Sequence, residues 1–257
     1  MIKLVASDLD GTILLNGAQS VDESLFETIH RLAEQGMIFA PASGRQYHSL
    51  KQLFGPISKE LMYIAENGAL VMFREEVIYK RTMDRKLAME IIEDVYTQPD
   101  CEVLVSGLKT AYIKPKSEVY LHRMTSVVKY KTSIMDKFDD IDDDILKIAV
   151  CNLSGIHNSR DYFVNKWSDK VLTAVSGDQY LDFTAIGVNK GTAMQHIQEK
   201  LGIAPDECMA FGDNFNDIEM LDNVGYSYAM EKAHDGVKKH AKFTTGLVER
   251  TLKEKFL

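Results

Sequence analysis

Two aspartates near the start of the chain, Asp8 and Asp10, are the residues best placed to do chemistry. They follow an apolar run over residues 2–6, which predicts a buried strand. Alternate residues leaving a strand point to the same side, so the two carboxylates can converge at the strand end, where α/β sheets hold their active sites. Gly11 then permits a sharp turn. A turn with two solvated carboxylates would share this sequence, so other residues must decide between the alternatives.

Two later stretches carry polar residues at the ends of predicted elements. Ser43, Gly44 and Arg45 follow the short apolar run at residues 37–40. A hydroxyl and a glycine N–H at that position suit a phosphate oxygen, although an ordinary helix cap would also explain them. Lys190 opens an amphipathic helix, where a cation opposes the helix dipole. This local conflict favours a functional lysine, with a solvated side chain as the alternative.

A third stretch follows the apolar run at residues 208–212. Asp213, Asn216 and Asp217 lie together directly after this predicted strand. Oxygen ligands grouped at a strand end are what a Mg²⁺ site requires, whereas an Asp-rich and Asn-rich helix cap would bind no metal. The stretch therefore indicates a candidate magnesium site.

The four stretches together resemble the four motifs of the haloacid dehalogenase superfamily, in the same order along the chain. Residues 212–217 match the fourth motif, G-D-x-x-N-D, completely. The resemblance implies that Asp8 is a nucleophile and Asp10 a general acid/base. It also implies that Mg²⁺ is held by Asp8, the Asp10 carbonyl and Asp213, with Asp217 close by. The phosphate-binding residues would be Leu9, Ser43, Gly44, Lys190 and Asn216, with Arg45 a further candidate.

The order of predicted elements indicates an α/β fold with an insertion. A strand, a helix beginning after Asp22 and a second strand form a βαβ unit, which predicts a parallel sheet. From residue 82 to residue 184 the pattern changes to short strands and helices that carry none of the four motifs. This arrangement resembles the Cof-like, type IIB branch of the superfamily. We therefore expect a Rossmann-like core at 1–81 and 185–257 and an inserted α+β cap at 82–184.

The composition narrows the class of protein. A net charge of -8 over 257 residues argues against a nucleic-acid binder with a broad basic surface. The sequence contains no run of about 20 apolar residues, so we expect no membrane span. The acidic motif at residue 8 does not suit a cleaved signal peptide. Three scattered cysteines suggest neither a disulfide framework nor a zinc site. We expect a cytoplasmic protein.

For two further polar segments the sequence predicts no function. Glu66-Asn67-Gly68 recurs in the Cof-like branch, but a plain Asn-Gly turn explains it equally well. The acidic run at residues 139–144 lacks the glycine and terminal glutamate of a calcium-binding loop, which favours a solvated turn.

The resemblance implies a Mg²⁺-dependent phosphatase that acts on small phosphorylated metabolites, with sugar phosphates the leading class, through an aspartyl-phosphate. A phosphomutase built on the same intermediate is one alternative. A non-catalytic binder of phosphorylated ligands is another, although it would have no use for the nucleophile Asp8. The substrate itself is not predicted, because its recognition would depend on the cap.

Overall fold

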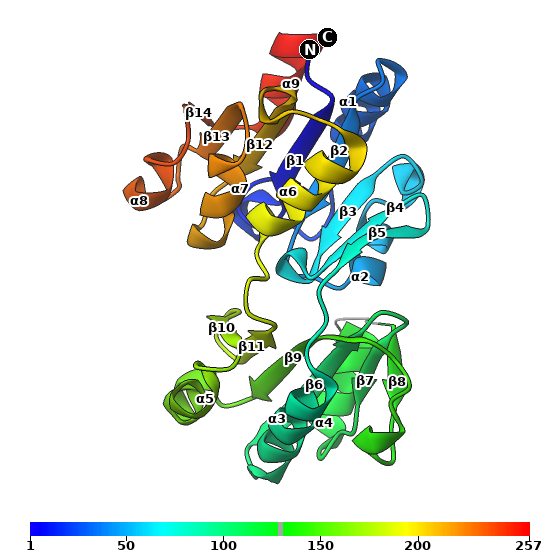
Figure 1. The fold of residues 1–257 in the computed structure, drawn as a ribbon, viewed down its shortest axis with the longest axis vertical. Coiled ribbons are helices and arrows are strands. Elements are labelled where there is room, and N and C mark those ends of the chain that lie inside the picture. Colours follow the sequence, from blue (N-terminus) through cyan, green and yellow to red (C-terminus); the bar gives the residue numbers. More distant parts are fainter. Residues whose placement is uncertain (128–130) are drawn as a thin grey trace. The chain divides into compact units, whose positions relative to one another are not determined.

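The protein is described from a computed structural model that covers residues 1–127 and 131–257 (Figure 1). The chain divides into two compact units, one formed by Met1–Lys80 with Asn189–Leu257 and the other by Arg81–Val188. We call them the core unit and the inserted unit. The expected boundaries of the insertion were residues 82 and 184.

The core unit is built on an eight-stranded sheet in the order β14-β13-β12-β1-β2-β3-β4-β5. Its strands are β1 (Leu4–Asp8), β2 (Ile38–Ala42), β3 (Met62–Ala65), β4 (Leu70–Phe73), β5 (Glu76–Lys80), β12 (Cys208–Gly212), β13 (Tyr226–Met230) and β14 (Phe243–Thr245). All neighbouring pairs from β14 to β3 are parallel, and only β4 and β5 add antiparallel pairs. Chain order reverses between β1 and β12, and ligands of open α/β sheets bind at such a reversal.

Helices complete the core unit as a Rossmann-like fold. They are α1 (Glu23–Glu34), α2 (Tyr47–Leu53), α6 (Lys190–Leu201), α7 (Ile218–Asp222), α8 (Asp235–Lys238) and α9 (Val248–Phe256). The helix predicted after Asp22 is α1, in which Leu25, Ile29 and Leu32 are buried and Ala33, at the same helical spacing, is half-buried. The edge strand β14 was not predicted, because its short sequence is largely exposed and lacks an apolar run.

The inserted unit contains a six-stranded sheet in the order β10-β11-β9-β6-β7-β8. Its strands are β6 (Cys101–Gly107), β7 (Ala111–Ile113), β8 (Thr132–Ile134), β9 (Ile145–Asn152), β10 (Leu172–Val175) and β11 (Tyr180–Thr184), with helices α3 (Arg85–Thr97), α4 (Glu118–His122) and α5 (Arg160–Trp167). Apolar residues of α3 and α5 pack with alternate residues of β6 and β9, such as Val105 and Ile148. The intervening residues, such as Leu104 and Ala149, pack with Tyr120 of α4. Both sheet faces are therefore covered.

Among the described residues, no helix combines the length and apolar character that crossing a membrane requires. The three cysteines, Cys101, Cys151 and Cys208, are buried free thiols.

Candidate active site

Three strands of the core sheet end side by side and place the predicted site residues at one edge. Asp8 is the last residue of β1 and is paired in register with Ala42, directly before Ser43. On its other side, β1 pairs with β12, with Ser7 opposite Phe211. Asp213 is the first residue after the end of β12. The parallel register therefore brings residues from three distant sequence stretches to the carboxyl ends of neighbouring strands.

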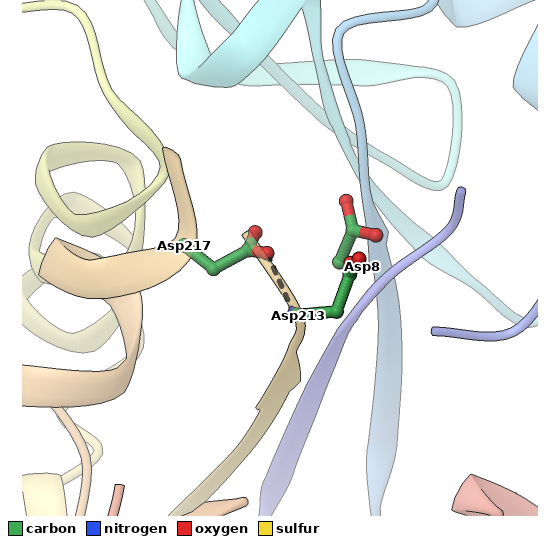
Figure 2. Close-up of side chains that lie close together, drawn as sticks. All are labelled: Asp8, Asp213 and Asp217. Carbon is green, nitrogen blue, oxygen red and sulfur yellow. Dashed lines mark hydrogen bonds between the residues drawn. The ribbon is translucent and has the colours of Figure 1, made fainter. Parts of the chain in front are cut away.

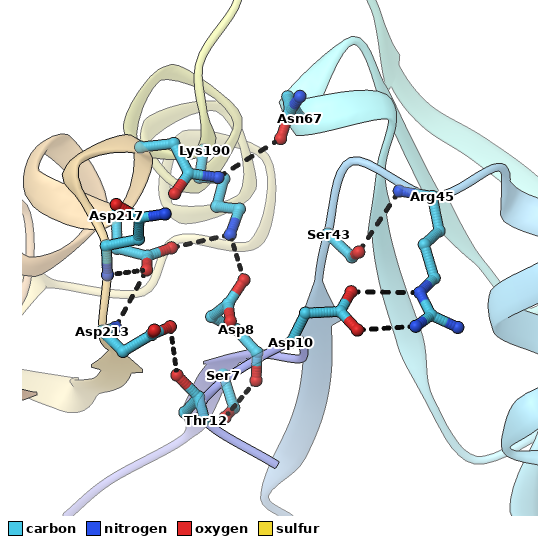
Figure 3. A network of polar contacts seen from close by, with 12 residues as sticks. Ser7, Asp8, Asp10, Thr12, Ser43, Arg45, Asn67, Lys190, Asp213 and Asp217 are labelled. Carbon is cyan, nitrogen blue, oxygen red and sulfur yellow. Dashed lines mark hydrogen bonds and ion pairs between the residues drawn. The ribbon is translucent and has the colours of Figure 1, made fainter. Parts of the chain in front are cut away.

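Lys190 lies at the centre of this group (Figure 3). Its side chain is fully buried, and its ammonium contacts Oδ1 of Asp8 and, at 2.6 Å, Oδ1 of Asp217. Burial opposes the charged form, yet the two carboxylates together raise the pKa of Lys190 above its ordinary value. The lysine predicted from its conflict with the helix dipole is thus a buried cation shared by two carboxylates.

Asp217 is a structural hub as well as a partner of the lysine. Its Oδ2 accepts the backbone N–H groups of Asp213 and Asn214, each at 3.0 Å. Both carboxylate oxygens are therefore engaged by protein groups, and the first turn after β12 is fixed in place. This arrangement suits Asp217 to orienting the site more than to binding a metal directly.

Asp8, Asp213 and Asp217 form a cluster in which one carboxylate oxygen of each residue lies within 4.8 Å of one from each of the other two (Figure 2). Asp213 accepts a hydrogen bond from the Thr12 hydroxyl at 3.0 Å. The buried Oδ2 atom of Asp8 accepts no hydrogen bond from the described residues. An orphaned carboxylate oxygen beside a second carboxylate is a fitting environment for a hard divalent cation such as Mg²⁺.

Three carboxyl groups of the cluster share a single lysine. Burial raises the pKa of Asp8 to about 8; Lys190 opposes this rise, while Asp217 and Asp213 add to it. Burial likewise raises the pKa of Asp213, with Thr12 acting in the other direction. A bound divalent cation would favour the ionised form of both carboxyl groups.

Gly11 allows this cluster to form at close range. Its φ of +97° is one that residues with a side chain rarely adopt. A Cβ at this position would lie 2.3 Å from Oδ2 of Asp213. The glycine of the first motif is therefore required by both backbone conformation and space.

Asp10 lies apart from the buried cluster and pairs with Arg45 (Figure 3). The guanidinium donates from Nη2 to Oδ1 at 2.6 Å and from Nε to Oδ2 at 3.1 Å. The backbone N–H of Arg45 in turn donates to the Ser43 hydroxyl at 3.2 Å. Asp10 is more than half exposed, so the two aspartates predicted as a pair have different surroundings.

The remaining predicted residues also lie at this edge. Leu9 is buried, and its carbonyl accepts the N–H groups of Ile13 and Leu14, which closes the turn after β1. Asn216 is exposed, and its amide donates to Oδ1 of Asn67 at 3.5 Å. Sequence reasoning assigned no role to Asn67 or to Thr12. The only sequence signal for Asn67 was the Glu-Asn-Gly stretch that an ordinary turn also explains.

Comparison with known proteins identifies the family. Residues 5–250 match the family model of haloacid dehalogenase-like hydrolases. The chain is 30% identical to the 5-amino-6-(5-phospho-D-ribitylamino)uracil phosphatase YbjI of Escherichia coli K12, over 95% of this chain and 91% of that protein. A crystal structure from Eubacterium rectale superposes with a TM-score of 0.87 at 32% identity, covering 100% of this chain and 99% of the other.

A more distant structure has the same fold. The subclass IIB sugar phosphatase BT4131 superposes with a TM-score of 0.79 at 18% identity and covers 98% of both chains. The chain therefore belongs to the haloacid dehalogenase-like hydrolase family, in its Cof-like branch, and is a phosphoric monoester hydrolase.

Proposed function

We propose that this protein is a Mg²⁺-dependent phosphatase that hydrolyses phosphomonoesters of small metabolites, sugar phosphates in particular, through an aspartyl-phosphate. The observation that carries the proposal is the buried Asp8 carboxylate, which has one oxygen on Lys190 and the other free of hydrogen bonds among the described residues. This environment suits a nucleophile that is held in one orientation beside a metal ion.

Asp8, Asp213 and the carbonyl of Asp10 would hold the metal. Asp217 would keep Asp213 and Lys190 in position by accepting the N–H of Asp213 and pairing with the ammonium of Lys190. Bound Mg²⁺ would offset the repulsion between carboxylate and phosphate and orient both groups. The hydroxyl of Ser43, the N–H groups of Leu9 and Gly44, the ammonium of Lys190 and the amide of Asn216 would bind the phosphoryl oxygens.

The two aspartates divide the chemistry. Asp8 would attack phosphorus and form an acyl phosphate as the bond to the ester oxygen breaks, and Asp10 would give its proton to the departing alkoxide. Asp10, now ionised, would accept a proton from a water molecule that attacks the phosphorus of the intermediate, which releases inorganic phosphate and restores Asp8. Arg45 would hold Asp10 in place between these events.

The relatives support the substrate class. The name of the E. coli relative specifies a phosphorylated ribityl chain, which is a polyol phosphate close in chemistry to a sugar phosphate. We extend this substrate class to the present chain, propose that the inserted unit is a cap that recognises the leaving group, and place the enzyme in the cytoplasm.

The proposal is tested by measuring phosphate release from a panel of sugar, nucleotide and cofactor phosphoesters, with Mg²⁺ and with EDTA. We expect metal-dependent release, and a loss of at least about 10³-fold in Asp8→Asn with the fold unchanged by circular dichroism. Asp22→Asn is the matched control, because Asp22 is exposed and its side chain makes no capping hydrogen bond. Activity in Asp8→Asn equal to that of wild type would overturn the mechanism. Movement of phosphate within a sugar without release would identify a phosphomutase instead.

A further inference from the structure

The turn that follows β3 has an unusual backbone. Glu66 and Asn67 are consecutive non-glycine residues with positive φ angles of 50° and 55°, and Gly68 follows with φ of 99°. Non-glycine residues rarely adopt this left-handed region outside hairpin turns such as the one at Arg74 and Glu75, and asparagine tolerates it better than most. Such strain persists where the surrounding structure enforces it, and it concentrates at functional sites.

Two neighbouring segments enforce this conformation. The N–H of Glu66 donates to the carbonyl of Arg45 at 3.1 Å, and the N–H of Asn67 donates to the carbonyl of Ser43 at 3.0 Å. On the other side, a Cβ on Gly68 would lie 2.3 Å from the carbonyl oxygen of Asn189. The turn therefore packs between the loop that carries Ser43 and the start of the helix that carries Lys190.

The strained backbone aims the Asn67 carboxamide at the candidate phosphate site (Figure 3). Its amide atoms lie 3.0 and 3.1 Å from the position that a Cβ on Gly44 would take. Its Oδ1 accepts from the amide of Asn216 at 3.5 Å. With Oδ1 directed to Asn216, the Nδ2 group offers N–H donors that suit an anionic oxygen.

We propose that Asn67 is a further phosphoryl-binding residue, whose Nδ2 group donates to a non-bridging oxygen of the substrate phosphoryl group beside Gly44 and Asn216. The assignment rests on the proposed phosphatase function and deepens it. It also gives a reason for the strained turn. Asn67 lies two residues beyond the end of β3, and its left-handed backbone lets the side chain lie over Gly44.

The decisive variant is Asn67→Gly, because glycine keeps the left-handed backbone without strain and removes only the carboxamide. The probe is inorganic phosphate, which has no leaving group, measured as a competitive inhibitor in the presence of Mg²⁺. We expect the inhibition constant to rise, and kcat/KM to fall, by about 10- to 100-fold, as for the loss of a hydrogen bond to a charged group. The melting temperature should change little.

Asn16→Gly is the matched control, since Asn16 is an exposed asparagine with a nearly identical φ of 54° and contacts Lys232 instead. It should leave the inhibition constant unchanged. Asn67→Asp is the second variant and keeps the shape and the backbone preference while replacing the donor with a charge that repels phosphate. It should weaken phosphate inhibition at least as much as Asn67→Gly, and it carries the test if the glycine variant does not fold.

An unchanged inhibition constant for phosphate in a folded Asn67→Gly or Asn67→Asp protein overturns the inference, even if KM for an ester rises. If wild type hydrolyses no ester, the proposed function fails separately. Calorimetric titration of wild type and the two variants with Mg²⁺ and inorganic phosphate then still decides whether Asn67 binds phosphate.

Discussion

Lys190 combines a structural role with the chemical role proposed above. Its ammonium is fully buried between Asp8 and Asp217, so it neutralises two carboxylates that would otherwise repel each other. The arrangement is costly to disturb, because removing one member of a buried ion pair leaves an uncompensated charge.

We predict that Lys190→Met abolishes phosphate release and lowers the free energy of unfolding by about 3–5 kcal/mol, because two buried carboxylates lose their cation. Urea denaturation followed by far-ultraviolet circular dichroism measures the stability. The double variant Lys190→Met/Asp217→Asn should recover part of the lost stability, since one of the like charges is gone, but no activity. A double variant no more stable than the single one would contradict the electrostatic explanation.

Helices α6 and α7 meet at Gly191, which directly follows Lys190. A Cβ on Gly191 would lie 2.5 Å from backbone atoms of Glu219 in α7. The close approach of these helices therefore holds Lys190 against Asp217, which precedes α7.

We predict that Gly191→Ala destabilises the protein by about 1–3 kcal/mol, because the added methyl group must push the two helix backbones apart. Phosphate release should also fall, since Lys190 is displaced with α6. Circular dichroism and phosphate release measure the two effects. Gly55→Ala is the control, because Gly55 is exposed, its Cβ would meet no atom within 4 Å, and its φ is not positive. Equal stability of the two variants would argue against tight helix packing.

The chain divides into two compact units, and the inserted unit, which has a hydrophobic core of its own, also carries a spectroscopic probe. Trp167, the single tryptophan of the chain, donates from Nε1 to Asp94 of α3 at 2.8 Å. Lys166 and Tyr162 of α5 contact the same carboxylate. Asp94 thus joins two helices of the inserted unit, and Trp167 fluorescence reports on this contact.

This contact should depend on pH. Burial favours the neutral form of Asp94, but the hydrogen bonds from Lys166, Trp167 and Tyr162 prevail and lower its pKa. A depressed carboxyl pKa stabilises the folded state above the unfolded value of about 3.9, and this stabilisation is lost as the pH falls through the folded pKa. We therefore predict that Asp94→Asn lowers stability by about 1–3 kcal/mol at pH 7 and that the difference from wild type shrinks below about pH 4.

Urea unfolding followed by Trp167 fluorescence at several pH values measures this difference. Asp161→Asn is a suitable control, because Asp161 lies on α5, the helix that carries Trp167, and pairs only with its exposed neighbour Arg160 among the described residues. A difference between wild type and Asp94→Asn that stays constant from pH 7 to pH 3 would contradict the explanation.

Local sequence determined much of this protein. Four short stretches predicted the family through their resemblance to its motifs, and the order of the apolar runs predicted the α/β fold, because strands and helices leave a local periodicity in the sequence. The first strand was predicted two residues early, since the apolar run begins at Ile2 whereas β1 spans Leu4–Asp8. Polar or exposed strands such as β8 and β14 left no apolar signal and were not predicted.

Tertiary structure alone decided which side chains meet. The Asp10–Arg45 ion pair, the burial of Lys190 between two carboxylates, and the contact of Asn67 with Asn216 across 149 positions of sequence all depend on parallel strands ending at one edge. Local preference cannot specify such contacts, because an Asn-Gly sequence also suits an ordinary exposed turn. Asn67 became a candidate for the site only when the packing of its strained turn against Ser43 and Asn189 was known.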